Sequence, residues 1–192
     1  TGGGRRVDRI YGERGVDAST RRMQLQRKSG SGMEPQAFRD LFADGKAGHA
    51  GFRESAALIA HAMGWPIDDI RETCEPVVAD RRIQTEYFTV EPGHSRGLHQ
   101  VVTVHNGDTA RVTLDLKMVL DAEDPHDLVR IEGDPPLELV SPSGIAGDHA
   151  TVAALVNVIP RFLAASPWRK LLSELGCAAN TPRNSEVIAS LA

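Results

Sequence analysis

Apolar residues in the first third of the chain repeat at the spacing expected of helices. Phe38, Leu41 and Phe42 share one face of a segment that opens with Pro35 and closes at Gly45. Proline is favoured in the first turn of a helix and glycine just past the last, so both ends fit a helix. A second segment has the same kind of apolar stripe. Helices are therefore predicted at Pro35–Gly45 and Phe52–Met63, with a short helix or turn at Met23–Arg27.

Further along, the pattern changes to the two-residue period of strands. Val112, Leu114 and Leu116 alternate with Thr113 and Asp115, which gives that strand one polar face. Strands are predicted at Arg5–Glu13, Ile67–Ala79, Arg82–Glu91, Leu98–His105, Ala110–Asp121, Leu128–Ile131 and Leu137–Val140. Asn106-Gly107-Asp108 predicts a tight hairpin turn, and Pro135-Pro136 predicts a break in the sheet.

The segment Ala150–Ala165 is apolar around most of its circumference and predicts a helix that Pro160 kinks. Such a helix needs cover on several sides, which a missing domain or a second subunit could supply. A last short helix is predicted at Trp168–Leu175. The predicted fold class is α+β, a mixed and largely antiparallel sheet with helices packed on it.

Composition and charge narrow the function classes. The 192 residues, 41% hydrophobic and 25% charged, match one globular domain. A net charge of −4 argues against a nucleic-acid partner, and the absence of a long apolar run argues against a membrane protein. Cys74 and Cys177 have no metal or redox spacing, so we expect reduced thiols and a cytoplasmic location. Because the chain begins without Met on a predicted strand, we interpret it as part of a longer protein.

Three glycine-rich loops each lead into a predicted helix. They are Lys28–Gly32, Gly45–Gly51 and Ser141–Gly147. Free backbone N–H groups at such junctions bind anions, so loops that meet would form a pocket for a carboxylate or another polar small molecule. The alternative is that these glycines serve only as turn and cap residues. No dinucleotide fingerprint is present, because Gly30-Ser31-Gly32 lacks both the third glycine and the preceding strand.

Few side chains are candidates for chemistry. His49 stands at a helix entrance, where a neutral, hydrogen-bonding imidazole is expected. Lys28 could neutralise an anion in its loop, and Arg53 could either contact a ligand or lie on a solvated helix face. His94 and His99 could form a metal pair, although no third ligand lies at suitable spacing. A metal-dependent hydrolase is accordingly the weakest alternative.

Several ordered motifs resemble one family. The run Gly48-His49-Ala50-Gly51-Phe52-Arg53-Glu54-Ser55, with Gly64-Trp65 after it, is similar to a signature of dihydrodipicolinate reductase-like proteins of the 2,4-diaminopentanoate dehydrogenase and amine dehydrogenase branch. The segments that carry the remaining similarity are Val16–Ser19, Leu25–Gly32, Ile131–Pro136, Gly144–Thr151 and Val156–Arg161. The similarity spans roughly residues 5–166, and the segment after Ala165 departs from the family.

The resemblance implies the substrate side of a two-domain enzyme. Residues 1–166 would be its substrate-binding and dimerisation domain, and residues 167–192 an unmatched C-terminal helix and tail. The absent N-terminal Rossmann domain would hold NAD or NADP and the family's acidic catalytic residue. The substrate would be an amine or amino acid, and the enzyme a homodimer. The residues implied to line the substrate pocket are His49, Thr151, Gly144 and Gly147, with Lys28 near the family's Lys and Ser-Gly-Thr motif. A non-catalytic small-molecule-binding or dimerisation module remains the alternative.

Overall fold

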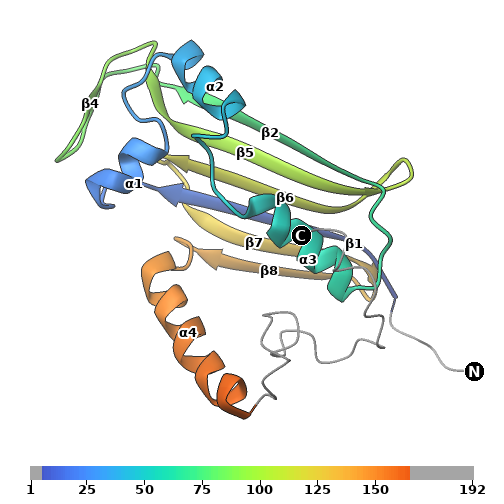
Figure 1. The fold of residues 1–192 in the computed structure, drawn as a ribbon. Helices are drawn as coiled ribbons and strands as arrows, with labels where there is room; N and C mark the ends of the chain where they lie inside the picture. Colours follow the sequence, from blue (N-terminus) through green and yellow to red (C-terminus); the bar gives the residue numbers. More distant parts are fainter. Residues whose placement is uncertain (1–5, 165–192) are drawn as a thin grey trace, which may run out of the picture.

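The computed structural model describes residues 6–164, and they form one six-stranded sheet with helices beside it (Figure 1). The elements follow in the order β1 (Arg6–Asp17), α1 (Met23–Lys28), α2 (Pro35–Ala43), α3 (Phe52–Ala62), β2 (Asp69–Val78), β3 (Ile83–Gln84), β4 (Thr89–Val90), β5 (Ser95–Asn106), β6 (Thr109–Val119), β7 (His126–Asp134), β8 (Leu137–Pro142) and α4 (Gly147–Ala164). The predicted α+β class is confirmed.

The sheet has the strand order β2-β5-β6-β1-β7-β8. Its neighbours are antiparallel except β1 and β6, which run parallel with Ile10 opposite Val112 and Asp17 opposite Val119. A parallel pair needs a long crossover between its strands. Here the connection contains three helices and four strands, and it returns the chain to the side of β1. The expectation of a mixed, largely antiparallel sheet is therefore confirmed.

Helices α2 and α3 lie on one face of the sheet, over β2, β5 and β6 (Figure 1). The alternation of the strands decides which side chains meet these helices. Val102, Val104 and Val112 are fully buried against Ala56 and Ala60 of α3. A second cluster at the other end of the same strands surrounds Phe38 and Leu98. The buried apolar clusters of the described chain thus lie on one face of one half of the sheet, where Ile83 of β3 and Val90 of β4 also join them.

Among residues 6–164, no helix packs on β7 and β8 as α2 and α3 pack on β2, β5 and β6. Val129, Leu137 and Leu139 have exposed fractions of 41, 47 and 59%. Helix α4 projects away from the sheet, and five apolar residues along it are 52–76% exposed (Figure 1). They are Val152, Leu155, Val156, Ile159 and Leu163. Within the described residues, no helix is both long and apolar enough to cross a membrane.

Two sequence predictions need correction. The single strand expected at Arg82–Glu91 is two short strands, β3 and β4, because Thr85 forms a turn: its hydroxyl oxygen accepts the Phe88 N–H at 3.0 Å. The first strand does not end at Glu13 but continues to Asp17. Gly12 and Gly15 do not end the strand, because both pair with β6 on one side and with β7 on the other.

The remaining expectations concern the C-terminal part. Helix α4 begins at Gly147 and continues through Pro160, the residue at which the sequence predicts a kink. The strands on either side of Pro135-Pro136, β7 and β8, are adjacent and antiparallel, so the prolines occupy a connection within one sheet. The short helix predicted at Trp168–Leu175 lies outside the described residues.

Candidate functional site

Each of the three glycine-rich loops leads into a helix, as expected: α2, α3 and α4 follow them in turn. At two positions in these loops the backbone requires glycine. Gly30 has a φ of +82°, and a Cβ there would overlap the buried ring of Phe38. Gly48 has a φ of +91°, and a Cβ would lie 3.1 Å from Phe42 and 3.4 Å from the Gln100 carbonyl oxygen. The loop that carries His49 is therefore packed tightly against the sheet.

A buried amide fixes the backbone of His49. Gln100, on β5, is 1% exposed, and its Oε1 accepts the His49 N–H at 2.7 Å. Its Nε2 donates to Glu72 Oε1 on β2 at 2.7 Å and lies 3.5 Å from the His49 carbonyl oxygen. A buried side-chain amide needs such partners, since an unpaired one would lose its hydration without compensation. Glu72, Gln100 and the His49 backbone thus form one network that sets the position of the loop.

The His49 ring lies at the surface, and its surroundings favour the neutral form. Partial desolvation lowers its pKa from the ordinary value, and repulsion from Lys28 and Arg14 lowers it further. The ring also packs edge-on against Phe52, with centroids 5.9 Å apart. A neutral imidazole both donates and accepts a hydrogen bond, which suits contact with a polar ligand.

Arg14 joins this region to the loop before α4. It lies on β1 and donates from Nη2 to the carbonyl oxygen of Ile145 at 2.7 Å. Asp127 of β7, 3.6 Å from Arg14 Nη1, accepts the Ile145 N–H on its other oxygen at 2.7 Å. Arg14 and Asp127 together therefore attach the loop containing Gly144 and Gly147 to the middle of the sheet.

The predicted site residues occupy different parts of this arrangement. His49 and Lys28 come close enough to interact electrostatically, and Gly147 lies next to Arg14. Arg53 is 48% exposed, and its guanidinium lies 3.9 Å from Glu72. Thr151 is exposed and donates its hydroxyl to the Gly147 carbonyl oxygen within the first turn of α4, at 2.8 Å.

Sequence reasoning missed Gln100 and Arg14. The signal for Gln100 was a polar residue in the buried register of β5, between Leu98 and Val102. Arg14 gave no such signal, because the sequence pattern ends β1 before it.

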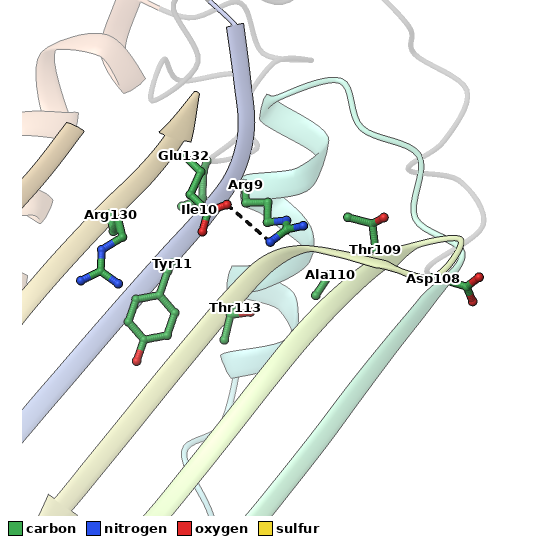
Figure 2. Close-up of a pocket in the computed structure, with 9 residues that line it drawn as sticks. All are labelled: Arg9, Ile10, Tyr11, Asp108, Thr109, Ala110, Thr113, Arg130 and Glu132. Carbon is green, nitrogen blue, oxygen red and sulfur yellow. Dashed lines mark ion pairs between the residues drawn. The ribbon is translucent and has the colours of Figure 1, made fainter. Parts of the chain in front are cut away.

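A cavity of about 370 Å³ lies on the opposite face of the sheet, where none of the described helices packs (Figure 2). Its two arginines already have partners: Arg9 lies 3.5 Å from Glu132, and Arg130 lies 2.7 Å from Glu138. Burial, followed by a hydrogen bond to Glu13, raises the pKa of Tyr11 to about 12, so this phenol remains protonated. The residues that line the cavity are Arg9, Ile10, Tyr11, Asp108, Thr109, Ala110, Thr113, Arg130 and Glu132. None of the predicted substrate-binding residues is among them.

Metal and thiol chemistry find little support in the part of the chain that the structure describes. It holds no group of three or more side chains arranged to bind a metal ion. His94 lies 2.9 Å from Glu34 and His99 lies 2.8 Å from Asp115, so each histidine has its own carboxylate. Cys74 is free and buried, and burial raises its thiol pKa to about 12, which disfavours the reactive thiolate.

A family model and a relative of known name both match this chain, and both carry the name of the same enzyme. The family model described as the 2,4-diaminopentanoate dehydrogenase C-terminal domain matches residues 1–187, which includes most of the segment 167–192 that the sequence motifs leave unmatched. A 2,4-diaminopentanoate dehydrogenase from Acetoanaerobium sticklandii is 27% identical over 157 residues, which cover 79% of this chain and 44% of that protein.

The solved structure of an amine dehydrogenase from Mycobacterium smegmatis has a similar fold. The TM-score is 0.71 at 18% identity, and the alignment covers 83% of this chain and 48% of that one. The chain therefore spans about half the length of each of these two relatives.

Proposed function

Since the chain belongs to the family of 2,4-diaminopentanoate dehydrogenase C-terminal domains, we propose that it is the substrate-side domain of an NAD(P)-dependent dehydrogenase that acts on the amino group of an amine or amino acid. The observation that carries this proposal is the family match over residues 1–187. The likeness to an amine dehydrogenase fold supports it.

Oxidation at an amine carbon transfers a hydride to the nicotinamide, releases a proton and leaves an imine, which water hydrolyses to a carbonyl compound and ammonia. Residues 6–164 contain no strand–helix–strand unit of the dinucleotide-binding kind. Their one parallel pair is β1 and β6, and the connection between these two strands contains other strands as well as helices. NAD or NADP would therefore be held mainly by the other half of the full-length protein. This chain would close the pocket and orient the substrate.

We assign the orienting role to the region around His49. The network of Gln100 and Glu72 holds the His49 backbone, and the lowered pKa favours a neutral ring. Such a ring can accept a hydrogen bond from an ammonium group or donate one to a carboxylate. A site held in place by buried partners orients its ligand at a smaller entropic cost than a mobile loop. Thr151 and the Gly144–Gly147 loop are proposed to line the same pocket.

The test is His49→Ala in the full-length protein. We expect the kcat/KM for the amine to fall by roughly tenfold to a hundredfold, as for loss of an oriented polar contact to substrate, while the affinity for NAD(P) is unchanged. His61→Ala is the matched control, because His61 lies in α3 outside the proposed site. Turnover of His49→Ala at the wild-type rate would refute the assignment of His49.

We also propose a cytoplasmic homodimer. The exposed apolar residues of α4 are suited to burial against a second copy or against the other half of the protein. The exposed apolar residues of α4 equally favour the second candidate function, a non-catalytic binding or dimerisation module.

Sedimentation of the full-length protein, combined with an activity assay, distinguishes the dehydrogenase from the module. A dimer without dehydrogenase activity would favour the module, and a monomer would contradict the proposed dimer.

A further inference from the structure

The hairpin that joins β5 to β6 carries an asparagine directly before a glycine. Of the four asparagines in the chain, only Asn106 is followed by glycine. Asn106 ends β5 and pairs with Thr109 of β6, so Gly107 and Asp108 form the loop between the strands. Gly107 is exposed and has a φ of +56°, in the left-handed region that favours glycine at the first position of such a loop. The turn therefore places an unhindered backbone nitrogen directly after the Asn106 side chain.

An Asn-Gly pair can lose its side-chain amide without an enzyme. The backbone nitrogen of Gly107 gives up its proton to water or hydroxide and attacks Cγ of Asn106. The N–Cγ bond forms and the Cγ–Nδ2 bond breaks, and the amide nitrogen takes up a proton and leaves as ammonia. Water then opens the cyclic imide at either carbonyl, which gives aspartate or isoaspartate. Asparagine is thermolabile through such chemistry, and glycine as the next residue has no Cβ to hinder the attack.

A single carboxylate binds both of the groups that would react. Asp68 is the residue before β2, and its Oδ2 accepts the Gly107 N–H at 2.6 Å and the Asn106 side-chain amide at 3.3 Å. The backbone N–H of Asp68 donates to the carbonyl oxygen of His105 at 2.9 Å, which fixes Asp68 beside the end of β5. The attacking nitrogen and the leaving nitrogen are thus both held by the same oxygen atom.

These contacts oppose the reaction. Gly107 must lose its proton before its nitrogen attacks, and a neighbouring carboxylate disfavours the anion that results. Closure of the ring also requires rotation of Asn106, which its pairing with Thr109 and its hydrogen bond to Asp68 resist. We propose that Asn106 is a deamidation site of this protein and that Asp68 protects it while the hairpin is folded. This inference is independent of the proposed dehydrogenase function.

The position of the turn gives the modification a structural consequence. Isoaspartate directs the main chain through its Cβ and so lengthens the backbone at the end of β5. Close to this end, Val104 pairs with Val112, and both are fully buried against α3. The new carboxylate at residue 106 would also face Asp68, which carries the same charge. Deamidation would therefore loosen the hairpin next to the buried core.

The experiment measures deamidation of the full-length protein during incubation at mildly alkaline pH. Trypsin releases residues 97–111 as one peptide, in which Asn106 is the only asparagine, and mass spectrometry gives the converted fraction. The test variant is Asp68→Ala. Asp69→Ala is the matched control, because Asp69 is an adjacent exposed carboxylate that pairs with Arg71 at 2.8 Å.

We expect Asn106 to deamidate roughly tenfold faster in Asp68→Ala than in the wild type, the size typical of one lost hydrogen bond to a charged group. Asp69→Ala should deamidate at the wild-type rate. In urea, where the hairpin is unfolded, wild type and Asp68→Ala should react at one common rate that exceeds the native wild-type rate. Equal native rates for wild type and Asp68→Ala, or an equal acceleration by Asp69→Ala, would overturn the proposal.

A destabilised core variant distinguishes protection at the turn from a general loss of stability. Leu98→Ala weakens the apolar cluster around Phe38, at the other end of the same strands, and leaves Asp68 in place. It should therefore accelerate deamidation less than Asp68→Ala does. An equal acceleration by both variants would assign the effect to unfolding of the whole chain and would contradict protection by Asp68.

Discussion

Apolar residues alternate along the strands in both halves of the sheet, but the described helices pack against only one of the two halves. In the half formed by β5 and β6, Val104 and Val112 are fully buried beneath α3. In the half formed by β7 and β8, Val129 and Leu139 point to the same side of the sheet, as the strand register shows, yet they are 41 and 59% exposed. Alternation therefore identifies the side of a strand that will be buried, but not the element that buries it.

The difference also shows which surface a further domain or a second copy of the chain could cover. The chain spans 44% of one relative and 48% of another, so about half of each relative has no counterpart here. We propose that this missing half or a second copy covers the β7–β8 half and α4. The candidate site lies between the two halves of the sheet, because Arg14 belongs to β1, the strand that joins them.

The largest expected effect is on stability, and it contrasts one leucine from each half. Leu98→Ala, in the buried half, should lower the free energy of unfolding of this 192-residue chain by about 2–5 kcal/mol, because it leaves a cavity in a packed core. Leu139→Ala, in the exposed half, should change it by no more than about 0.5 kcal/mol. Urea unfolding measures both. Equal losses would show that the β7–β8 half is already covered in the chain alone.

A smaller effect is expected at the network that holds the His49 loop. Gln100→Leu keeps the size of the side chain but leaves the His49 N–H and Glu72 without their partner, which should cost about 1–3 kcal/mol. Gln36→Leu is the control, since Gln36 is exposed on α2 and its amide donates to Asp40 on the same helix. In the full-length protein, Gln100→Leu should also lower kcat/KM for the amine. Stability as high as that of the wild type would argue that the network does not fix the loop.

Gln100 and His49 show how far sequence reasoning reached. The α+β class, the order of the helices and the glycine loops followed from periodicity and from turn residues, which depend on local physical chemistry. Gln100 escaped notice because its partners, Glu72 and His49, are distant in sequence and meet only through the pairing of β2 with β5 and the packing of the loop. The turn at Thr85 was missed for a related reason: its side chain replaces the glycine or proline that normally indicates a turn.

A further prediction concerns pH. Because the folded state lowers the pKa of His49 below its ordinary value of 6.5, the unfolded chain binds the proton more readily. Stability attributable to His49 is thus fully present above about pH 7 and is lost as pH falls through 6.5 towards the folded pKa. His49→Asn should therefore lose less stability than the wild type on acidification from pH 7 to about pH 5. Parallel stability profiles for the two proteins would contradict the lowered pKa.

The smallest expected effect is a shift of that pKa. Lys28→Met removes one source of repulsion and should raise the pKa of His49, although desolvation, the larger cause, should keep it below the ordinary value. Arg27→Met should leave it unchanged. Titration of the imidazole signal by NMR measures both variants. A pKa insensitive to Lys28→Met would separate Lys28 from the His49 site.

The central claim is that this chain forms the substrate side of an amine-oxidising dehydrogenase, and the formation of products tests it most directly. The full-length protein is incubated with NAD or NADP and with either 4-aminopentanoate or 2-aminopentane, and reduced nicotinamide and ammonia are measured together. We expect amine-dependent formation of both products in equal amounts, and none from the 192-residue chain alone. A folded full-length protein that binds the dinucleotide but forms neither product from either amine would contradict the account.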